Sequence, residues 1–335
     1  MSFLSRTRRS IHGFAALGAV ALAIVVASCK SADAPREIPP ASRSSQAKRL
    51  GSRFETWPAI SGLVEIGPDR LVVVHDVKPK AKSPALGLVR VGPTAERNFY
   101  EPIAISPPVE PPLNDIEAIA LVPPRNDVAV ILESGGAGTA QRAVLVEFAA
   151  HGDTWSARTI GAPVDLGHGD GSLTNIEALA VESASLDAST AVVLVADRSS
   201  VDATRRAEVV VQRFALDFAH GSATSRGEAL RFAFALPASA PGEPTSWRAC
   251  SDFLLEPDGG MLVAAASDPG DVGPFASIVY RVSGGTGATR TVEPVATIDG
   301  LKVEGLARVS GTTMLWIGSD DEAFGGVVRP IALAR

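Results

Sequence analysis

The feature that most constrains this chain is a short internal repeat that occurs five times. In each copy an apolar run opens on a polar residue: Ser61, Glu117, Glu177, Ser251 and Glu304. A turn and a second apolar run follow, ending near an acid: Asp76, Glu133, Asp197, Asp268 and Asp320. Repetition at a period of roughly 50 to 60 residues is typical of stacked or radial units. Because the runs are short, β-rich and bounded by Gly, Pro, Asp and Asn, the repeat predicts an all-β fold, a β-propeller.

The number of repeats predicts the number of blades. Each unit has room for about four strands, and third strands are expected at 87–91, 143–148, 208–214 and 277–282. The last unit is short, so we expect a strand near 53–57 to complete it. Pairing the N- and C-terminal strands in one sheet closes the ring and removes open sheet edges. Five blades are preferred, and six are the alternative if the stretch between Glu177 and Ser251 hides an extra unit.

The first 28 residues have the composition of an export signal. Arg6, Arg8 and Arg9 precede an apolar stretch, 14–26, which is too short for a stable membrane span. Residues 26–29, Val-Ala-Ser-Cys, resemble the bacterial lipobox, in which cleavage precedes a cysteine that carries lipid such as palmitate. We therefore expect a lipoprotein signal peptide at 1–28 and an exported protein anchored in the bacterial cell envelope through Cys29. Sec and twin-arginine export both remain open.

The remaining chain divides into a tether and one domain. Residues 29–52 are rich in Pro, Ser, Ala and mixed charge, which favours a flexible linker, and 53–335 form the propeller. Cys250 is the only cysteine besides Cys29, so a disulfide framework within the domain is excluded. With 37 acidic against 31 basic side chains and no basic stripe, nucleic acid is not an expected partner. We expect a monomer that contacts the membrane through its lipid.

The propeller geometry predicts a cation site on the axis. The first strand of each blade lines the centre, so Ser61, Glu117, Glu177, Ser251 and Glu304 are expected to meet there. Three carboxylates brought together repel one another and need compensation. A donor set of oxygens alone favours Ca²⁺ over zinc. The alternative is that each glutamate only hydrogen-bonds the neighbouring blade.

The ends of the second strands predict a ligand-binding mouth. Because the second strand of each blade runs antiparallel to the first, its end lies on the same side of the ring as the glutamates. The expected mouth residues are Glu133, Asp197, Arg198, Asp268 and Asp320. Arginines such as Arg142 can hold a small anionic ligand through paired donors, although loop arginines are more often solvated surface. A protein partner is the other ligand class compatible with this mouth.

The order Ser, Glu, Glu, Ser, Glu resembles the soluble calcium-activated nucleotidase (apyrase) family. The local amino-acid sequence is similar to that family at 60–64, 74–76, 250–254, 261–265, 276–280 and 301–306. The resemblance implies a five-bladed propeller with a central Ca²⁺ and nucleotide hydrolysis at the mouth. His75-Asp76-Val77-Lys78 lacks the Asp-Asp-Arg run expected there, so only Asp76 carries over as a catalytic residue. Weaker likenesses link 114–118 to uncharacterised bacterial propellers and 319–326 to esterase-like phytase propellers.

Two function classes follow, and the sequence leaves open whether the protein is an enzyme. In the first, a metal-dependent hydrolase, Ca²⁺ polarises the phosphoryl oxygens of a phosphate ester or nucleotide, Asp76 orients water and Arg142 holds the anion. In the second, a non-enzymatic ligand-binding or protein-interaction propeller, the calcium is structural. The second class is favoured by the lack of a recognisable nucleophile–base pair, because Ser134 does not stand in a nucleophile elbow.

Overall fold

The computed structural model describes one of the two compact units of the chain. These units are Met1–Glu37 and Ile38–Arg335, and every described residue belongs to the second. The described residues are 58–76, 84–93, 98–134, 141–152, 154–167, 173, 175–187, 189–199, 201, 205–236, 246–270, 273–284 and 290–334. The expected signal peptide, Cys29, the tether and the strand near 53–57 lie outside these residues.

The described residues form strands and one short 3-10 helix. The first two groups of strands are β1 (Gly62–Gly67), β2 (Arg70–Val74), β3 (Leu86–Arg90) and β4 (Phe99–Ile105), then β5 (Ile116–Leu121), β6 (Val128–Glu133), β7 (Arg142–His151), β8 (Thr154–Thr159) and β9 (Val164–Asp165). The third is β10 (Ile176–Ser185), β11 (Thr190–Asp197), β12 (Arg206–Asp217), β13 (Ser222–Ser225) and β14 (Leu230–Ala235). The last two are β15 (Trp247–Leu255), β16 (Met261–Ser267), β17 (Ala276–Ser283) and β18 (Thr291–Asp299), then β19 (Val303–Arg308), β20 (Leu315–Ser319), helix η3 (Glu322–Phe324) and β21 (Val328–Ile331).

Within each group, the innermost strand pairs antiparallel with the next strand along the chain, as expected from the short runs joined by turns. One parallel contact between β4 and β8, at Ala104–Ser156 and Ile105–Ala157, joins the first two groups into a nine-stranded sheet. The other three groups are sheets of five, four and three strands. The long stretch between Glu177 and Ser251 therefore carries a single sheet in the part that the structure describes.

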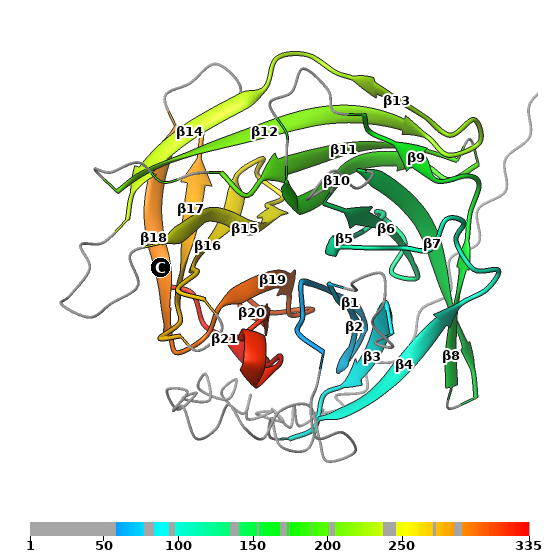
Figure 1. The fold of residues 1–335 in the computed structure, drawn as a ribbon, viewed down its shortest axis with the longest axis horizontal. Helices are drawn as coiled ribbons and strands as arrows, with labels where there is room; N and C mark the ends of the chain where they lie inside the picture. The colour runs from blue at the N-terminus through cyan, green and yellow to red at the C-terminus, as the bar shows by residue number, and fades with distance from the viewer. Residues whose placement is uncertain are drawn as a thin grey trace, which may run out of the picture. The chain divides into compact units, whose positions relative to one another are not determined.

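The innermost strands lie around a common centre (Figure 1). They are β1, β5, β10, β15 and β19, and each contacts the next one in this order, with β19 returning to β1. All five apolar runs predicted from the repeat are these strands, and the runs that follow them are β2, β6, β11, β16 and β20. The prediction of an all-β, propeller-like fold is thus confirmed.

Hydrophobic side chains fill the spaces between adjoining sheets. Five core clusters lie between consecutive groups of strands, and one of them packs Ile60 and Leu63 of the first group against Ala307 and Trp316 of the last. The innermost strands approach closely where a side chain is absent. A Cβ atom on Gly305 would lie 3.1 Å from the amide nitrogen of Leu63, so only glycine fits comfortably at this contact.

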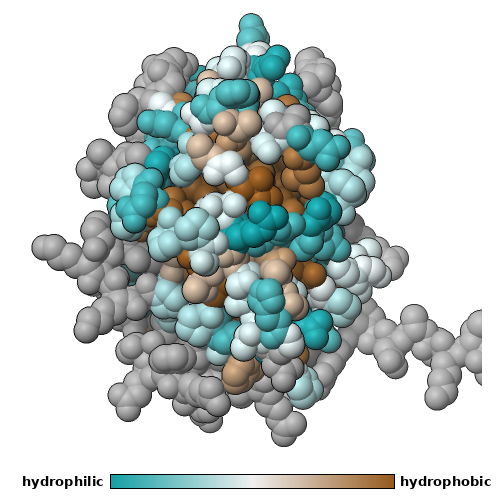
Figure 2. All heavy atoms as spheres, turned by 90° about the vertical axis from the view of Figure 1, so that its right-hand side faces the viewer, coloured by the Kyte–Doolittle hydropathy of each residue, from teal (hydrophilic) through white to brown (hydrophobic). Residues whose placement is uncertain are grey.

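The outer surface is mixed in polarity. Figure 2 shows the side that bears β4, β7 and β8, where hydrophobic side chains form a band between hydrophilic ones. Phe99 and Phe324 are the large apolar side chains that are exposed among the described residues, at 37% and 45%. None of the helices among the described residues has the length and apolarity needed to cross a bilayer.

Candidate functional site

The three ring glutamates occupy equivalent places in their strand pairs. The register of β5 with β6 skips from Ile116 to Ala118, and β10 with β11 and β19 with β20 skip at the same point. The skipped residues are Glu117, Glu177 and Glu304. A β-bulge leaves its extra residue out of the ladder and redirects the side chain. The three repeated glutamates therefore share a structural feature, a bulge at the same place in β5, β10 and β19.

These carboxylates act on one another electrostatically. Burial raises the pKa of Glu117 well above its ordinary value, and Glu177, Glu304, Asp76 and Asp115 raise it further. Burial also raises the pKa of Glu177, to about 6, against the opposing effect of nearby arginines. Acids that are far apart in the chain thus share one acidic environment, as the ring geometry predicts.

A buried arginine compensates part of this charge. Arg248 is 8% exposed, and its Nη1 donates to Glu304 Oε1 at 2.6 Å and to Glu177 Oε2 at 3.1 Å. Its Nε donates to Asp268 Oδ2 at 3.0 Å. Burial opposes the charge on Arg248, but Glu304, Glu177, Asp268 and Glu117 outweigh burial and raise its pKa above the ordinary value. One guanidinium therefore joins acids from three sheets.

A buried lysine completes what we call the axial network: Glu177, Arg248, Asp268, Lys302, Glu304 and Asp320. Lys302 is fully buried, and its Nζ lies 3.2 Å from Glu304 Oε1 and 3.7 Å from Asp320 Oδ2, with a further contact to Glu322. Burial opposes its charge, but Glu304 and Asp320 raise its pKa above the ordinary value. Burial raises the pKa of Asp320 to about 7.

The five ring residues do not fit a Ca²⁺ ion held by all of them. Ca²⁺ takes six to eight oxygen ligands at short distance. Glu177 and Glu304 are bound by Arg248, and the Ser251 hydroxyl donates to the carbonyl of Val303 at 2.6 Å. A central ion would have to share these oxygens with a buried guanidinium. The expected five-ligand site is therefore replaced in this structure by the axial network.

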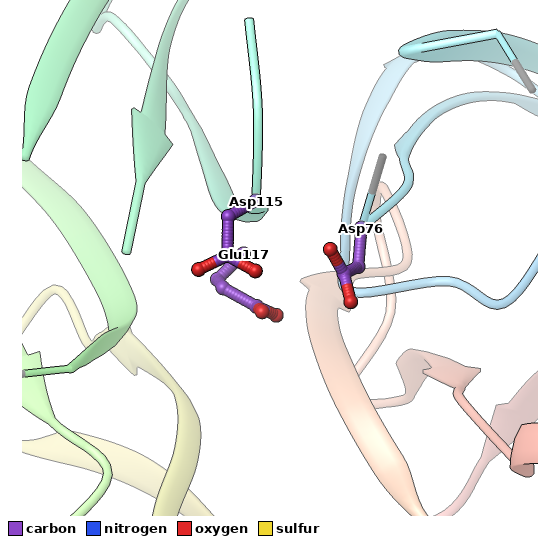
Figure 3. Close-up of side chains that lie close together, drawn as sticks. All are labelled: Asp76, Asp115 and Glu117. Carbon is purple, nitrogen blue, oxygen red and sulfur yellow. The ribbon is translucent and has the colours of Figure 1, made fainter. Parts of the chain in front are cut away.

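A second group of acids contains Glu117 itself. The acidic cluster consists of Asp76, Asp115 and Glu117, each of which offers a carboxylate oxygen within 4.8 Å of the others. In Figure 3, Asp76 faces Asp115 and Glu117 across a gap between the end of β2 and the start of β5. Oxygen donors in this arrangement can bind a hard divalent cation.

A buried hydroxyl adjoins the strands that carry this cluster. Ser61 is 1% exposed, and its Oγ has no hydrogen-bond partner among the described residues. Its amide donates to the carbonyl of Val74, two residues before Asp76. The next residue, Gly62, would bring a Cβ atom to 3.3 Å from the Cα of Ala118, beside Glu117. Ser61 is thus the ring residue whose hydroxyl remains available to a ligand.

Arg142 and Glu133 bind each other. Arg142 is 8% exposed; its Nη2 donates to Glu133 Oε1 at 2.9 Å, and Nη1 donates to the carbonyl of Pro111 at 3.0 Å. Glu133 Oε1 also accepts the amide of Asn114 at 2.6 Å. Both side chains hold the segment that leads into β5. Their expected places at the catalytic site and the mouth do not fit this geometry, because their polar atoms are already engaged.

The other acids at the strand ends also bind backbone amides. Asp197 accepts the amide of Asn175 at 2.8 Å, and Asp320 accepts the amide of Glu322 at 2.8 Å. Arg198 donates to Glu177 Oε1 at 2.9 Å while part of its side chain stays exposed. Burial raises the pKa of Asp268, but Arg248 and Lys302 outweigh burial and lower it below the ordinary value. The predicted mouth residues therefore bind backbone amides and the charged side chains of the axial network.

Sequence reasoning missed Arg248, Lys302 and Asp115 as site residues. A signal for two of them was present, because residues two apart on a strand share a face. The positions two before the ring glutamates hold Asp115, Asn175 and Lys302, and Asn175 Nδ2 indeed donates to Glu177 Oε1 at 2.8 Å. Arg248 stands three residues before Ser251, so strand alternation does not indicate it.

Comparisons with known proteins give no family. No family model matches the chain, and no curated protein matches it. Two crystal structures of Sqt1 from Chaetomium thermophilum are similar at 14% identity, and the matches cover 85% of this chain and 75% of those chains. The TM-score is 0.34 for both, which carries no argument about fold or function. The resemblance to calcium-activated nucleotidases stays a prediction.

Proposed function

We propose that this protein is a five-bladed propeller that binds a divalent cation at the acidic cluster and acts as a non-enzymatic binding module. Five blades are supported by five innermost strands in cyclic contact and by five core clusters between adjoining sheets. The single sheet between Glu177 and Ser251 favours five blades over six. On this count the last blade has three described strands, and residues 53–57 are proposed to supply its fourth.

The observation that carries the cation proposal is the geometry of Asp76, Asp115 and Glu117. Their carboxylate oxygens lie within 4.8 Å of one another, and the buried hydroxyl of Ser61 adjoins the same strands. Acidic neighbours and burial both disfavour ionised Glu117, and a bound dication would reverse this effect. Ca²⁺ is the preferred ion, because all donors are oxygens.

The hydrogen bonds and ion pairs of the charged residues near the axis favour a binding role over catalysis. Arg142, the residue expected to hold an anionic substrate, is bound to Glu133 and two backbone carbonyls. Arg248 and Lys302 are bound within the axial network. The charged groups near the axis therefore stabilise the domain, and the cation orders the entrance between β2 and β5 for a small ligand or protein partner.

Calcium titration of the purified full chain tests the cation site. We expect the midpoint of thermal unfolding to rise with millimolar Ca²⁺ relative to EDTA, because an ion that binds only the folded state stabilises it. Asp115→Asn should abolish most of this rise. Glu208→Gln, which removes an exposed carboxylate paired with Arg231, is the matched control and should retain it. An unchanged midpoint in the wild-type protein would rule out the cation site.

Hydrolysis is the second candidate, favoured by one observation. Asp76, the catalytic residue implied by the resemblance, belongs to the acidic cluster and would stand next to a bound metal. There it could orient water toward a phosphoryl group that the cation polarises. Calcium-dependent release of phosphate from nucleotides or phosphate esters, lost in Asp76→Asn, would establish this activity. Calcium binding without turnover would support the binding module.

The proposed place of the protein is the bacterial cell envelope. The support is sequence alone: basic residues, a short apolar stretch and Val-Ala-Ser-Cys at 26–29. Cys29→Ala should release the expressed protein from the membrane fraction, whereas Cys250→Ala should leave it there. Membrane association that survives Cys29→Ala would contradict a lipid anchor at this residue.

A further inference from the structure

We infer that the guanidinium of Arg248 acts as a built-in axial cation in place of a divalent ion, and that removing it creates a calcium site from Glu177, Asp268 and Glu304. This inference is independent of the proposed function. That proposal concerns the acidic cluster, whereas this one concerns carboxylates that make ion pairs with Arg248.

The first argument is convergence. The three acids come from β10, from the residue after β16, and from β19, while Arg248 comes from β15. Three N–H···O bonds of 2.6 to 3.1 Å hold them on one side chain. These are oxygen donors from different sheets that face one point, as a metal site requires, and a cation already occupies that point.

The second argument is the register of β15, which positions the side chain of Arg248. The register of β15 with β16 runs from Arg248–Ala266 to Asp252–Ala264, so three residues of β15 oppose the single residue Ala265. In β5, β10 and β19 the shift leaves out only one residue. The longer bulge holds serine at the ring position and brings an arginine to the axis where the other bulges bring glutamate.

The third argument is charge. A guanidinium offers five donors in a rigid plane and is not deprotonated in proteins, so the site stays filled by one positive charge. Without Arg248, the buried Glu177 and Glu304 and the nearby Asp268 would face one another with Lys302 as the remaining buried cation of the network. Such a surplus of buried negative charge favours a divalent ion.

Calcium binding to Arg248→Met tests the inference. Methionine keeps most of the length of the side chain and removes the charge. We expect the full-chain variant to bind one Ca²⁺ more than the wild-type protein by titration calorimetry, and its unfolding midpoint to rise more on adding Ca²⁺. Arg248→Met/Glu304→Gln should lose the additional ion. Arg231→Met, which removes an exposed ion pair with Glu208, should bind as the wild type does.

Each outcome decides the matter. If Arg248→Met is unfolded in EDTA, recovery of its β-sheet circular dichroism on adding Ca²⁺ supports the inference. A variant that binds no additional ion, or that stays unfolded with and without Ca²⁺, overturns it. Failure of the proposed function gives a different result, since wild-type protein that binds no Ca²⁺ still permits the variant to bind one ion.

Discussion

Glu117 in β5 and Glu304 in β19 occupy the same bulge position but have opposite surroundings. Glu304 binds Arg248 at 2.6 Å and Lys302 at 3.2 Å. Glu117 makes no ion pair within the described part of the chain, and four acids raise its pKa. The difference begins two residues earlier, where Lys302 precedes β19 and Asp115 precedes β5.

This contrast separates the part of the axis whose charge Arg248 and Lys302 balance from the part where we propose that a cation binds. Around Glu304, buried cations from the protein itself complete the charge balance. Around Glu117, Asp76 and Asp115 come from two neighbouring groups of strands, and the three side chains offer carboxylate oxygens within 4.8 Å of one another. One repeat position thus has two different surroundings, because the adjoining residues and not the glutamate determine the charges around it.

The largest expected effect is that of Glu304→Gln. This change leaves Arg248 and Lys302 buried with one carboxylate fewer, and breaking a buried ion pair from one side typically costs about 3 kcal/mol or more. We expect the free energy of unfolding, measured with urea at pH 7 in EDTA, to fall by about that amount. A loss below about 1 kcal/mol, which is the range of exposed ion pairs, would contradict the stabilising role that distinguishes Glu304 from Glu117.

Lys302→Met should be less severe. Its removal leaves Glu304 bound to Arg248, and Asp320, with a pKa of about 7, can take up a proton. We expect a loss of about 2 kcal/mol at pH 7 in the same measurement, with a smaller loss at pH 5. Equal losses at the two pH values would show that protonation of Asp320 does not relieve the variant.

Glu117→Gln should raise the free energy of unfolding, whereas the two preceding variants lower it. A carboxyl group whose pKa is higher in the folded than in the unfolded chain favours folding while protonated. That contribution is present below the ordinary pKa of 4.5 and is lost as pH rises through the higher folded value. In EDTA at pH 8, the glutamine variant should therefore be more stable than wild type by about 1 kcal/mol, and near pH 4 the two should be alike. Destabilisation at pH 8 would show that Glu117 has a stabilising partner.

The smallest expected effect is that of Asp115→Asn, which places an asparagine two residues before Glu117, as Asn175 stands two residues before Glu177. Removing one acid should lower the pKa of Glu117 and raise stability in EDTA at pH 8 by about 0.5 kcal/mol. Carbon-13 NMR of the glutamate carboxyls measures this pKa directly. An unchanged pKa would mean that Asp76, Glu177 and Glu304 alone set the environment of Glu117.

The fold could be read from the chain because its signals are local. Apolar runs bounded by turn residues predicted the five innermost strands and their five partners, and the runs at 87–91, 143–148, 208–214 and 277–282 lie in or across β3, β7, β12 and β17. The parallel contact between β4 and β8 was not foreseen, since it joins strands of different repeats at Ala104 and Ser156.

The sequence by itself determined which glutamates stand at equivalent positions, because strand alternation and a repeating bulge act within a few residues. Only the tertiary structure decided which charges meet them. Arg248 reaches Glu177 and Glu304 across 71 and 56 residues of chain, and it does so through a bulge that strand alternation does not predict. A buried charge must be compensated by whatever the closed ring brings beside it, and that depends on long-range packing.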